Sequence, residues 1–258
     1  TSTYTRVVLV TNCTRSILGL LKSKKPLQLY RERWDATPSI NIIMSTKLYD
    51  KAFITGCDSN NEWQLPWFFE NYKKHNDTPL VFADFGVKDI EAIKPHVHAV
   101  VDLTKVEEKG WFKKPKAIYH CPAKRKVWLD TDCEIRSNIG GIFDLLKPQM
   151  LNMIEDKPWA KRRGGVQYNS GVVGVIDNPI ILGMWAQWVQ ESGEVGDQEV
   201  LTANLNPNTA IKYINSLPNE YNWLRLQIEN DNEPATNARV IHWTGAKGND
   251  RIRSMMNG

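Results

Sequence analysis

The sequence predicts an α/β protein in which a mostly parallel central sheet is flanked by helices. Two features of the 258-residue chain support this prediction. From Lys51 onward, short apolar segments alternate with segments whose hydrophobic residues have a helical spacing. The apolar segments are almost continuously hydrophobic, which is typical of parallel strands that helices cover on both faces. We therefore expect one large α/β domain.

The N-terminal residues have a different character from the rest of the chain. The segment TRVVLV at 5–10 has the composition of a strand, but the segment at 22–39 is charged, contains prolines and has no clear period. We expect residues 1–48 to form an N-terminal extension that packs on a main domain at 49–258.

The first half of the main domain has a regular pattern. Each expected strand ends in polar, turn-forming residues, as in the CDSNN segment that follows the first strand. The helix that comes next places Trp63 and Trp67 four residues apart, on one face. Strands are expected at 51–56, 78–86, 96–103 and 126–129, with helices at 62–75 and 88–94 and a helix or turn at 114–122.

The second half is less regular. A clear helix is expected at 179–192, where Trp185 and Trp188 lie three residues apart. A further helix should begin near Asp197, which occupies an N-cap or first-turn position. The remaining expected elements are a short helix at 139–146 and strands at 166–176 and 238–243.

Acidic residues follow several of the expected strands. Asp58, Asp84 and the pair Asp130 and Asp132 each come at or just after a strand end. Ligands of open α/β sheets bind beyond the carboxyl ends of the strands, so we expect these acids to converge along one edge.

Asp130 and Asp132 are separated by one residue, a spacing at which two carboxylates can share a divalent cation. Mg²⁺ and Mn²⁺ are commonly bound by one or two carboxylates together with phosphate oxygens of a substrate. The alternative is an ordinary Asp-rich turn, because a D-x-D triplet is a short motif. Aspartyl-phosphate phosphohydrolases also have D-x-D after a strand, but they typically have Thr or Val where this chain has Glu134.

Composition excludes some classes of function. The net charge of +4 is too small for the dense basic face of a nucleic-acid-binding protein. We find no apolar stretch of about 18 residues and no signal-peptide pattern, so we expect no membrane span in this chain. A cytoplasmic protein is expected, and the alternative is a luminal catalytic fragment whose anchor has been removed. The four cysteines form no CxxC pair.

Four segments together resemble a known enzyme family. VWLDTDCEI at 127–135 is similar to the metal-binding motif of nucleotide-sugar-dependent glycosyltransferases of the GT-A fold. YNSGVVGV at 168–175, GDQEVLT at 196–202 and HWTGAKG at 242–248 resemble, in the expected order, segments of family 8, which includes glycogenin and bacterial lipopolysaccharide galactosyltransferases. The segment that begins at Phe53 also resembles the strand that receives the nucleotide base. The likeness extends roughly from Lys51 to Gly248.

The resemblance implies a single Rossmann-like GT-A domain, with a nucleotide-binding half at 49–135 and an acceptor and catalytic half at 136–258. It implies a hexosyl- or pentosyltransferase that moves a sugar from a nucleoside-diphosphate sugar, with UDP as the nucleotide, to a hydroxyl acceptor such as a glycan. Mn²⁺ or Mg²⁺ is the implied cofactor, and family 8 favours retention at the anomeric carbon.

The resemblance also implies roles for single residues. His242 would be the third metal ligand beside Asp130 and Asp132, while Asp197 and Gln198 would be catalytic, with Glu199 a lesser candidate. Together with the acids at the strand ends, the residues expected to bind the donor are Thr55, Gly56, Asp58, Asp84, Lys116, Asp130, Asn169, Ser170, Gly245 and Lys247.

Plainer interpretations of several of these residues remain open. Lys116 is equally well read as a solvated helix lysine, the Asn-Ser-Gly segment as a turn, and Asp197 as a simple N-cap. Lys247 lies two residues after Gly245, where the family has three. Trp159, in a basic segment, is a candidate for binding the acceptor by stacking, or belongs to an ordinary exposed loop.

A different class of function also remains open. The chain could be a non-catalytic sugar- or nucleotide-binding module with the same fold. The joint presence of Asp130, Asp132, Asp197 and His242 argues against it, because a module without turnover does not need all four.

Overall fold

The computed structural model describes residues 40–43 and 47–258. Residues 1–39 and 44–46, which include most of the expected extension at 1–48, lie outside the described part of the chain. Strand β1 (Asn41–Ile43) falls within that expected extension and pairs antiparallel with β4 (Ala99–Asp102) at one edge of the sheet. No helix among the described residues has the length and apolar character needed to cross a membrane.

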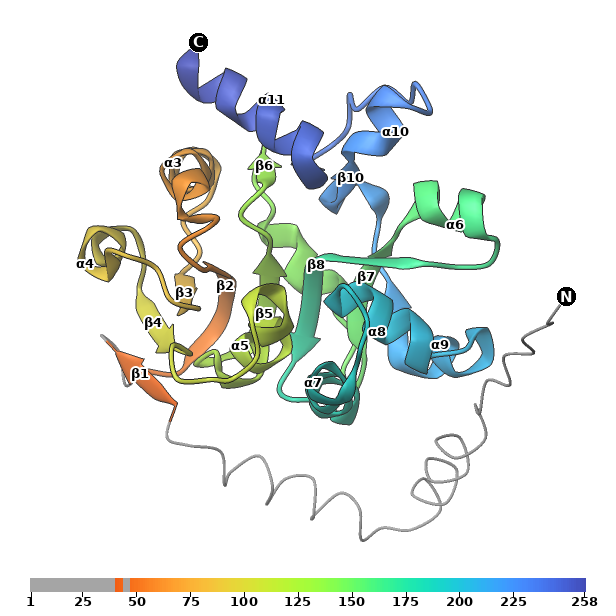
Figure 1. Ribbon diagram of the computed structural model, residues 1–258, viewed down its shortest axis with the longest axis horizontal. Helices are drawn as coiled ribbons and strands as arrows, with labels where there is room; N and C mark the ends of the chain where they lie inside the picture. Colours follow the sequence, from red (N-terminus) through yellow and green to blue (C-terminus); the bar gives the residue numbers. More distant parts are fainter. Residues whose placement is uncertain (1–39, 44–46) are drawn as a thin grey trace, which may run out of the picture. The chain divides into compact units, whose positions relative to one another are not determined.

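The described residues form a central sheet of eight strands in the order β1-β4-β3-β2-β5-β8-β7-β9 (Figure 1). Its other strands are β2 (Tyr49–Cys57), β3 (Leu80–Asp84), β5 (Ala123–Leu129), β7 (Leu151–Glu155), β8 (Tyr168–Ile176) and β9 (Ile214–Ser216). Strands β4, β3, β2 and β5 are parallel, whereas β8 runs antiparallel to both of its neighbours. The predicted α/β fold with a mostly parallel sheet is therefore confirmed.

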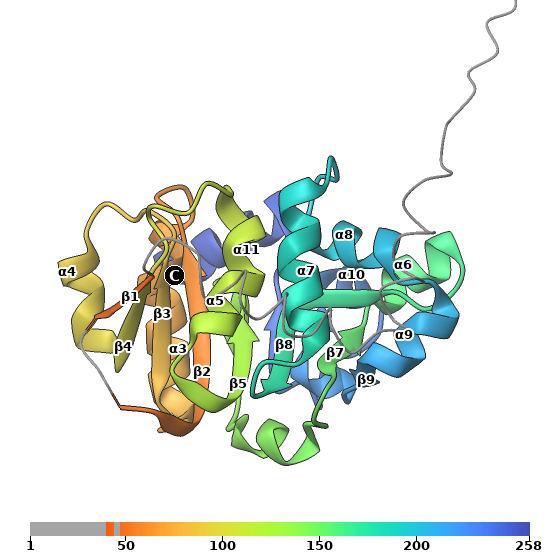
Figure 2. The ribbon, with the colours of Figure 1, turned by 90° about the horizontal axis from the view of Figure 1, so that it is seen from below.

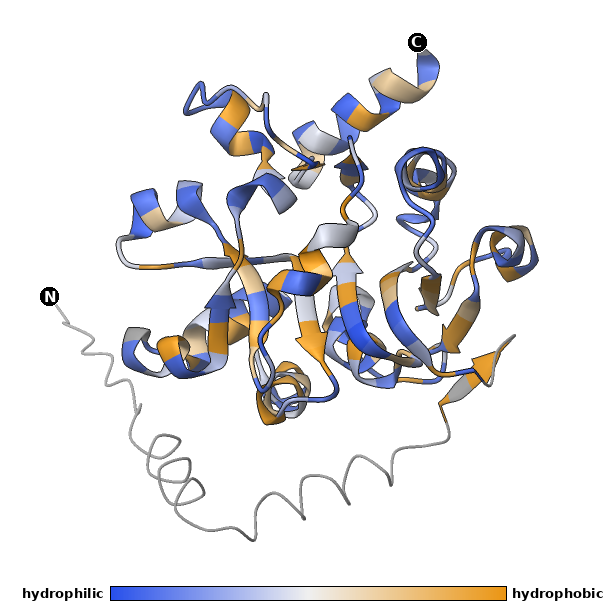
Figure 3. Ribbon diagram, turned by 180° about the vertical axis from the view of Figure 1, so that it is seen from behind, coloured by the Kyte–Doolittle hydropathy of each residue, from blue (hydrophilic) through white to orange (hydrophobic). Residues whose placement is uncertain are grey.

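Helices cover both faces of this sheet, and successive strand residues alternate between two cores. On β2, Phe53 joins the core under α3, whereas the next residue, Ile54, joins the core under α5 and α7. Figure 2 shows α5 and α7 side by side along one face. Figure 3 shows hydrophobic residues gathered along the strands. The continuous hydrophobicity of the strands follows from this burial on both faces.

The helices begin where the sequence offers a suitable first turn. Proline occupies the first turn of α3 and α5, where its missing N–H has no intrahelical partner in any case. Asp156 caps α6, since its carboxylate accepts a hydrogen bond from Trp159 N at 3.1 Å. The helices are α3 (Leu65–His75), α4 (Ile90–Ile93), α5 (Lys114–His120), α6 (Lys157–Arg163), α7 (Ile180–Glu191), α8 (Asp197–Asn204), α9 (Pro207–Tyr213), α10 (Arg225–Glu229) and α11 (Gly245–Asn257).

A second sheet of three short strands lies beyond the end of β5. It contains β6 (Cys133–Ile135), β10 (Trp223–Leu224) and β11 (Val240–His242), in the order β10-β11-β6. The acidic turn at residues 130–132 joins the end of β5 directly to β6, and β11 pairs with β6 so that His242 lies opposite Cys133. This small sheet therefore carries the C-terminal histidine to the carboxyl edge of the large sheet.

Some elements differ from the expectation. The basic segment around Trp159 is the helix α6, and the residues from Gly245 onward form α11. The strands of the small sheet are two or three residues long, and strands of that length leave no readable hydrophobic period. Asp197 is the first residue of α8, and Gly196 is its N-cap, so the Asp197 carboxylate is not used for capping.

Candidate active site

Two adjoining cavities lie at the carboxyl edge of the large sheet. The β2 cavity, of about 220 Å³, is lined by the end of β2 and the start of α11, and includes Gly56, Asp58 and Asn249. The β8 cavity, of about 370 Å³, is lined by the start of β8 and of α8, and includes Asn169, Asp197 and Gln198. They form one cleft, because both are lined by Trp111, Lys114, Asp130, Asp132 and Gly245.

The acidic turn at residues 130–132 lies where the two cavities meet, and we call this narrow part of the cleft the waist. Backbone hydrogen bonds hold the turn, so its carboxylates are not needed for that purpose. Asp130 N donates to Gly171 O at 2.9 Å, which extends the pairing of β5 with β8. Cys133 N donates to Asp130 O at 3.1 Å, and Trp243 N donates to Asp132 O at 3.0 Å. The side chains of Asp130 and Asp132 instead contact Lys114, Trp128 and His242. The pair is therefore more than a self-bonded Asp turn.

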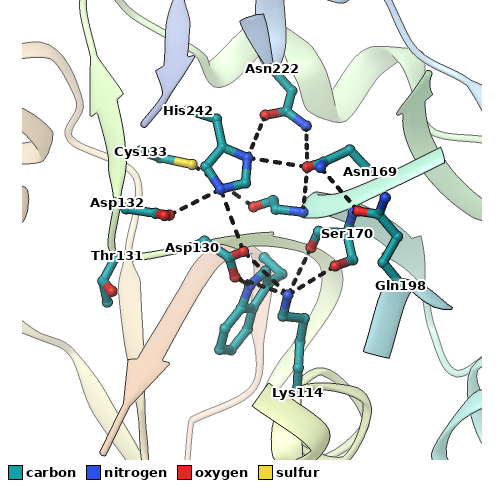
Figure 4. A network of polar contacts seen from close by, with 12 residues as sticks. Lys114, Asp130, Thr131, Asp132, Cys133, Asn169, Ser170, Gln198, Asn222 and His242 are labelled. Atoms are coloured by element: carbon teal, nitrogen blue, oxygen red, sulfur yellow. Dashed lines mark hydrogen bonds and ion pairs between the residues drawn. The ribbon is translucent and has the colours of Figure 1, made fainter. Parts of the chain in front are cut away.

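His242 faces the acidic pair through one ring nitrogen and two amides through the other (Figure 4). Its Nε2 lies 3.0 Å from Asp132 Oδ1 and 3.7 Å from Asp130 Oδ2. Its Nδ1 lies 3.1 Å from both Asn169 Oδ1 and Asn222 Oδ1. Burial lowers the pKa of the imidazole, but the charge and hydrogen bond of Asp132 and the charge of Asp130 outweigh it, so the pKa of His242 is raised.

Lys114, the first residue of α5, is a buried cation at the junction of the two cavities. Its side chain is 2% exposed, and its Nζ lies 3.0 Å from Asp130 Oδ1 and 3.1 Å from Asp197 Oδ2. It also donates to the carbonyl oxygen and hydroxyl of Ser170, at 3.1 and 3.2 Å. Two carboxylates thus share one ammonium group. The sequence reasoning selected Lys116 and missed this residue.

The pKa values of this cluster follow from burial and charge. Burial raises the pKa of Asp130, but Lys114 and His242 lower it by more, so the net shift is downward. For Asp197, burial together with the charge of Asp130 outweighs Lys114, and its pKa is raised. Burial lowers the pKa of Lys114, but its two carboxylates raise it well above the ordinary value.

Gln198 is held by neighbours on both sides of its amide. Its Oε1 accepts hydrogen bonds from Asn169 Nδ2 at 3.0 Å and Ser170 N at 3.3 Å. Its Nε2 donates to Asp156 Oδ2 at 3.1 Å, and the same oxygen accepts from Asn169 Nδ2 at 3.2 Å. Asp156 therefore joins the cap of α6 to Gln198. The sequence reasoning missed Asp156, whose visible signal was only that of an N-cap before Lys-Pro.

The structure places the other expected donor-binding residues in different surroundings. Thr55 is fully buried, and Asp84 accepts hydrogen bonds from Gly86 N and Val87 N in the turn after β3. Lys116 is buried against Glu108, with 2.6 Å between Nζ and Oε1. Lys247 is exposed on the first turn of α11. None of these four residues lines the β2 or the β8 cavity.

Trp159 lines the β8 cavity from α6. The guanidinium carbon of Arg163 lies 4.3 Å from the centroid of its ring, and that of Arg162 lies 5.4 Å away. Trp111, from the turn of 3-10 helix at Gly110–Lys113, is 52% exposed and lines both cavities. Its Nε1 donates to Val195 O at 3.3 Å, so it joins the loop before α8 to the waist. A half-exposed tryptophan at a cavity mouth was not anticipated from the sequence.

The residues at the waist suit a hard divalent cation. Ligand atoms of Asp132, Cys133 and His242 lie within 4.8 Å of one another, and Asp130 is adjacent. Burial and the neighbouring acids raise the pKa of the Cys133 thiol well above its ordinary value, which makes it a poor ligand. Two carboxylates and an imidazole remain, a donor set that fits Mn²⁺ more comfortably than Mg²⁺.

Comparisons with known proteins identify the fold. No protein-family model and no curated protein matches the sequence. Among solved structures, the glycosyltransferase GlyE of Streptococcus pneumoniae TIGR4 matches with a TM-score of 0.58 at 16% identity, over 76% of this chain and 55% of GlyE. The galactosyltransferase LgtC, solved with donor and acceptor sugar analogs, matches at 0.51 and 13% identity, over 80% of this chain and 95% of LgtC.

The bifunctional glycosyltransferase WbbM matches with a TM-score of 0.55 at 12% identity, over 78% of this chain and 47% of WbbM. The chain thus spans about half the length of GlyE and of WbbM, and nearly all of LgtC. At these identities the likeness is one of fold. The described part of the chain has the fold of solved glycosyltransferases.

Proposed function

We propose that this protein is a metal-dependent glycosyltransferase that moves a sugar from a nucleoside-diphosphate sugar, with UDP as the expected nucleotide, to a hydroxyl acceptor. The observation that carries the proposal is the two-part cleft, whose waist is formed by Asp130, Asp132 and His242. The fold shared with solved glycosyltransferases supports it.

The dimensions of the cleft suit such a donor. Binding pockets for small molecules usually measure about 300–1,000 Å³, so the β2 cavity of about 220 Å³ is small for a whole nucleotide sugar. We infer that it takes the nucleoside, and that the β8 cavity takes the sugar and the acceptor hydroxyl. The diphosphate then falls at the waist, where the two cavities share their lining.

The residues of the waist hold the diphosphate end of the donor. Asp130, Asp132 and the Nε2 of His242 would hold the divalent cation, which when bound supplies positive charge to the departing diphosphate. Lys114 adds a fixed ammonium beside it, in a site where few water molecules screen the charge. With the cation bound, the site would have two positive charges where the leaving group gains negative charge, and Lys114 is the one that the chain itself supplies.

The β8 cavity supplies groups that orient the sugar. Asp197 can accept hydrogen bonds from sugar hydroxyls, as a carboxylate already placed by Lys114. Gln198 uses one amide hydrogen on Asp156 and presents the other to the cavity. An inverting reaction would need a carboxylate that faces the acceptor as the general base, and Asp197 or Glu199 could be recruited for it, since both line this cavity. We propose retention because the resemblance to family 8 favours it.

The phosphohydrolase alternative is weakened by the fold, which the described residues share with solved glycosyltransferases. Glu134 also stands where aspartyl-phosphate phosphohydrolases typically have Thr or Val.

Incubation with a panel of nucleotide sugars and Mn²⁺ tests the proposal, with release of nucleoside diphosphate as the measurement. Slow hydrolysis of at least one donor is expected, and it should stop after chelation or in Asp132→Ala. Asp144→Ala is the matched control, because that side chain is 82% exposed and lies outside the cleft. The proposal fails if no donor is hydrolysed or bound.

A further inference from the structure

Asn222 is a buried residue whose side chain is within hydrogen-bond distance of two polar side chains of the site. It lies between the 3-10 turn at Asn219–Tyr221 and β10, and it is fully buried. Its Oδ1 lies 3.1 Å from His242 Nδ1, and its Nδ2 donates to Asn169 Oδ1 at 2.9 Å (Figure 4). None of the roles given above to the cleft residues accounts for it.

The orientation of both amides follows from their neighbours. Gly171 N, which can only donate, lies 2.9 Å from Asn169 Oδ1. The Nδ2 of Asn169 faces a carboxylate oxygen of Asp156 and Gln198 Oε1, at 3.2 and 3.0 Å, and both accept. Asn169 is thereby fixed, and Asn222 must then turn its Nδ2 to Asn169 Oδ1 and its own Oδ1 to His242.

The hydrogens of the His242 ring follow from the same logic. Its Nδ1 faces two amide oxygens at 3.1 Å, neither of which can donate, so Nδ1 carries a hydrogen. Its Nε2 faces the carboxylates of Asp132 and Asp130, which also only accept, so a second hydrogen is favoured there, and a bound cation would take the place of that hydrogen.

Gly171 confines the ring from the other side. A Cβ on Gly171 would lie 2.0 Å from His242 Cε1, so the ring passes directly against the glycine backbone. The imidazole is thus held sterically at Cε1 and by hydrogen bonds at Nδ1, and both constraints leave Nε2 facing the acids.

We propose that Asn222 is a positioning residue that, with Asn169, holds neutral His242 in the Nδ1–H tautomer and so presents Nε2 to a divalent cation at the waist. The inference rests on the metal site of the proposed function. Partners that orient a ligating histidine typically contribute about 10–100-fold to metal affinity, because they fix its tautomer and ring direction. The amide also suits the task because it accepts from Nδ1 without adding a charge.

The tautomer can be measured without substrate. Nitrogen-15 NMR of histidine side chains in protein loaded with Zn²⁺, a diamagnetic substitute for Mn²⁺, distinguishes Nδ1–H from Nε2–H. The chain has five histidines, so the signal of His242 can be assigned with a His242→Gln variant. Wild-type protein is expected to show the Nδ1–H form. An Nε2–H form overturns the proposal.

Mn²⁺ affinity, measured by calorimetry, gives the second readout. Asn222→Ala should weaken Mn²⁺ binding about 10-fold or more, whereas Asn222→Asp, which keeps an acceptor facing Nδ1 but loses the donor to Asn169 Oδ1, should bind Mn²⁺ more tightly than Asn222→Ala. Asn215→Ala is the matched control, since this buried asparagine donates to Asn152 Oδ1 at 2.8 Å on β9, outside the cleft.

The outcomes separate this proposal from the proposed function. Unchanged Mn²⁺ affinity in Asn222→Ala, equal losses in Asn222→Ala and Asn215→Ala, or absence of Mn²⁺ binding to the wild type would each overturn it. If Asn222→Ala does not fold, the tautomer of the wild type decides instead, and an Nε2–H form overturns the proposal. If the tautomer and affinities are as expected but no nucleotide sugar is hydrolysed, the positioning role stands and the glycosyltransferase proposal fails.

Discussion

Lys114→Met should destabilise the fold and also slow donor hydrolysis. The Lys114 side chain is 2% exposed and lies 3.0 Å from Asp130 and 3.1 Å from Asp197. Removing one member of a buried ion pair costs about 3–5 kcal/mol, because the remaining charge stays buried without a counter-ion. Asp130 keeps 26% of its side chain exposed and can be hydrated. We therefore expect a loss near the lower limit, about 3 kcal/mol in the free energy of unfolding at pH 7.

The pH dependence of this loss has a definite sign. In the wild type, the raised pKa of Lys114 means that its contribution is fully present below the unfolded pKa of about 10.4, and is lost only as the pH rises through the folded value. Asp130, whose pKa is lowered, contributes above the unfolded value of about 3.9. Without Lys114, the pKa of Asp197 rises further above its already raised value. The folded variant then binds a proton that the unfolded chain does not, so its deficit should shrink as the pH falls from 7 toward 5.

Urea denaturation at several pH values measures the stability of the variant, and release of nucleoside diphosphate measures its activity. Donor hydrolysis should fall about 100-fold, the usual effect of removing one fixed electrostatic group from an active site. Lys116→Met is the matched control, because it removes a buried ammonium paired with Glu108 outside the cleft. The reasoning is refuted if Lys114→Met unfolds within about 0.5 kcal/mol of wild type, or if both variants slow hydrolysis equally.

Three further substitutions test other parts of the site. Gly171→Ala should weaken Mn²⁺ binding at least about 10-fold, because the new Cβ would lie 2.0 Å from His242 Cε1. Gly174→Ala is the control, because its new Cβ would meet Leu146 in the core and should lower only the stability. Equal Mn²⁺ affinity in the two variants would contradict this prediction. Asp156→Ala removes the cap of α6 and the acceptor of Gln198, so urea denaturation should show a loss of about 1 kcal/mol and donor hydrolysis should slow; an unchanged rate would show that Gln198 needs no such support. Trp111→Ala should change the free energy of unfolding by less than about 0.5 kcal/mol, since the residue is 52% exposed. Steady-state kinetics should nevertheless show a higher KM for the donor or the acceptor. Unchanged KM values for both substrates would exclude a substrate contact of Trp111.

Features encoded by neighbouring residues were predictable from the sequence. The strand before Asp130 and the turn after it are local, and the general rule for parallel sheets then places the acids at the binding edge. The two lysines of the Lys-Pro-Lys segment show the limit of such reasoning. Residues 114 and 116 point to different faces of α5, and only the packing of that helix puts Lys114 in the cleft and Lys116 against Glu108.

Features that depend on distant pairing were not predictable from the hydrophobic pattern. Only the resemblance to a known family placed His242 beside the acidic pair, since it gets there by the pairing of β11 with β6, and both strands are only three residues long. Asn222 contacts Asn169 across 53 residues of sequence, in a hydrogen-bond network that leaves no periodic trace.

The contacts among the buried polar groups of the cleft favour the proposed glycosyltransferase over a non-catalytic binding module. Lys114, Asp197, Asn169, Asn222 and His242 are all buried within one patch, although polar side chains such as Lys126 and Gln227 are buried elsewhere as well. Burying such groups is costly, and replacing a buried ion pair by apolar residues of similar volume is often neutral or stabilising. A protein that needed only a stable fold, or a surface for a sugar, would be better served by apolar packing there. In the cleft, the carboxylates of Asp130 and Asp197 share the ammonium group of Lys114, and His242 faces the acidic pair beside them. Clusters of charged groups like this one are typical of sites where charge is redistributed during a reaction.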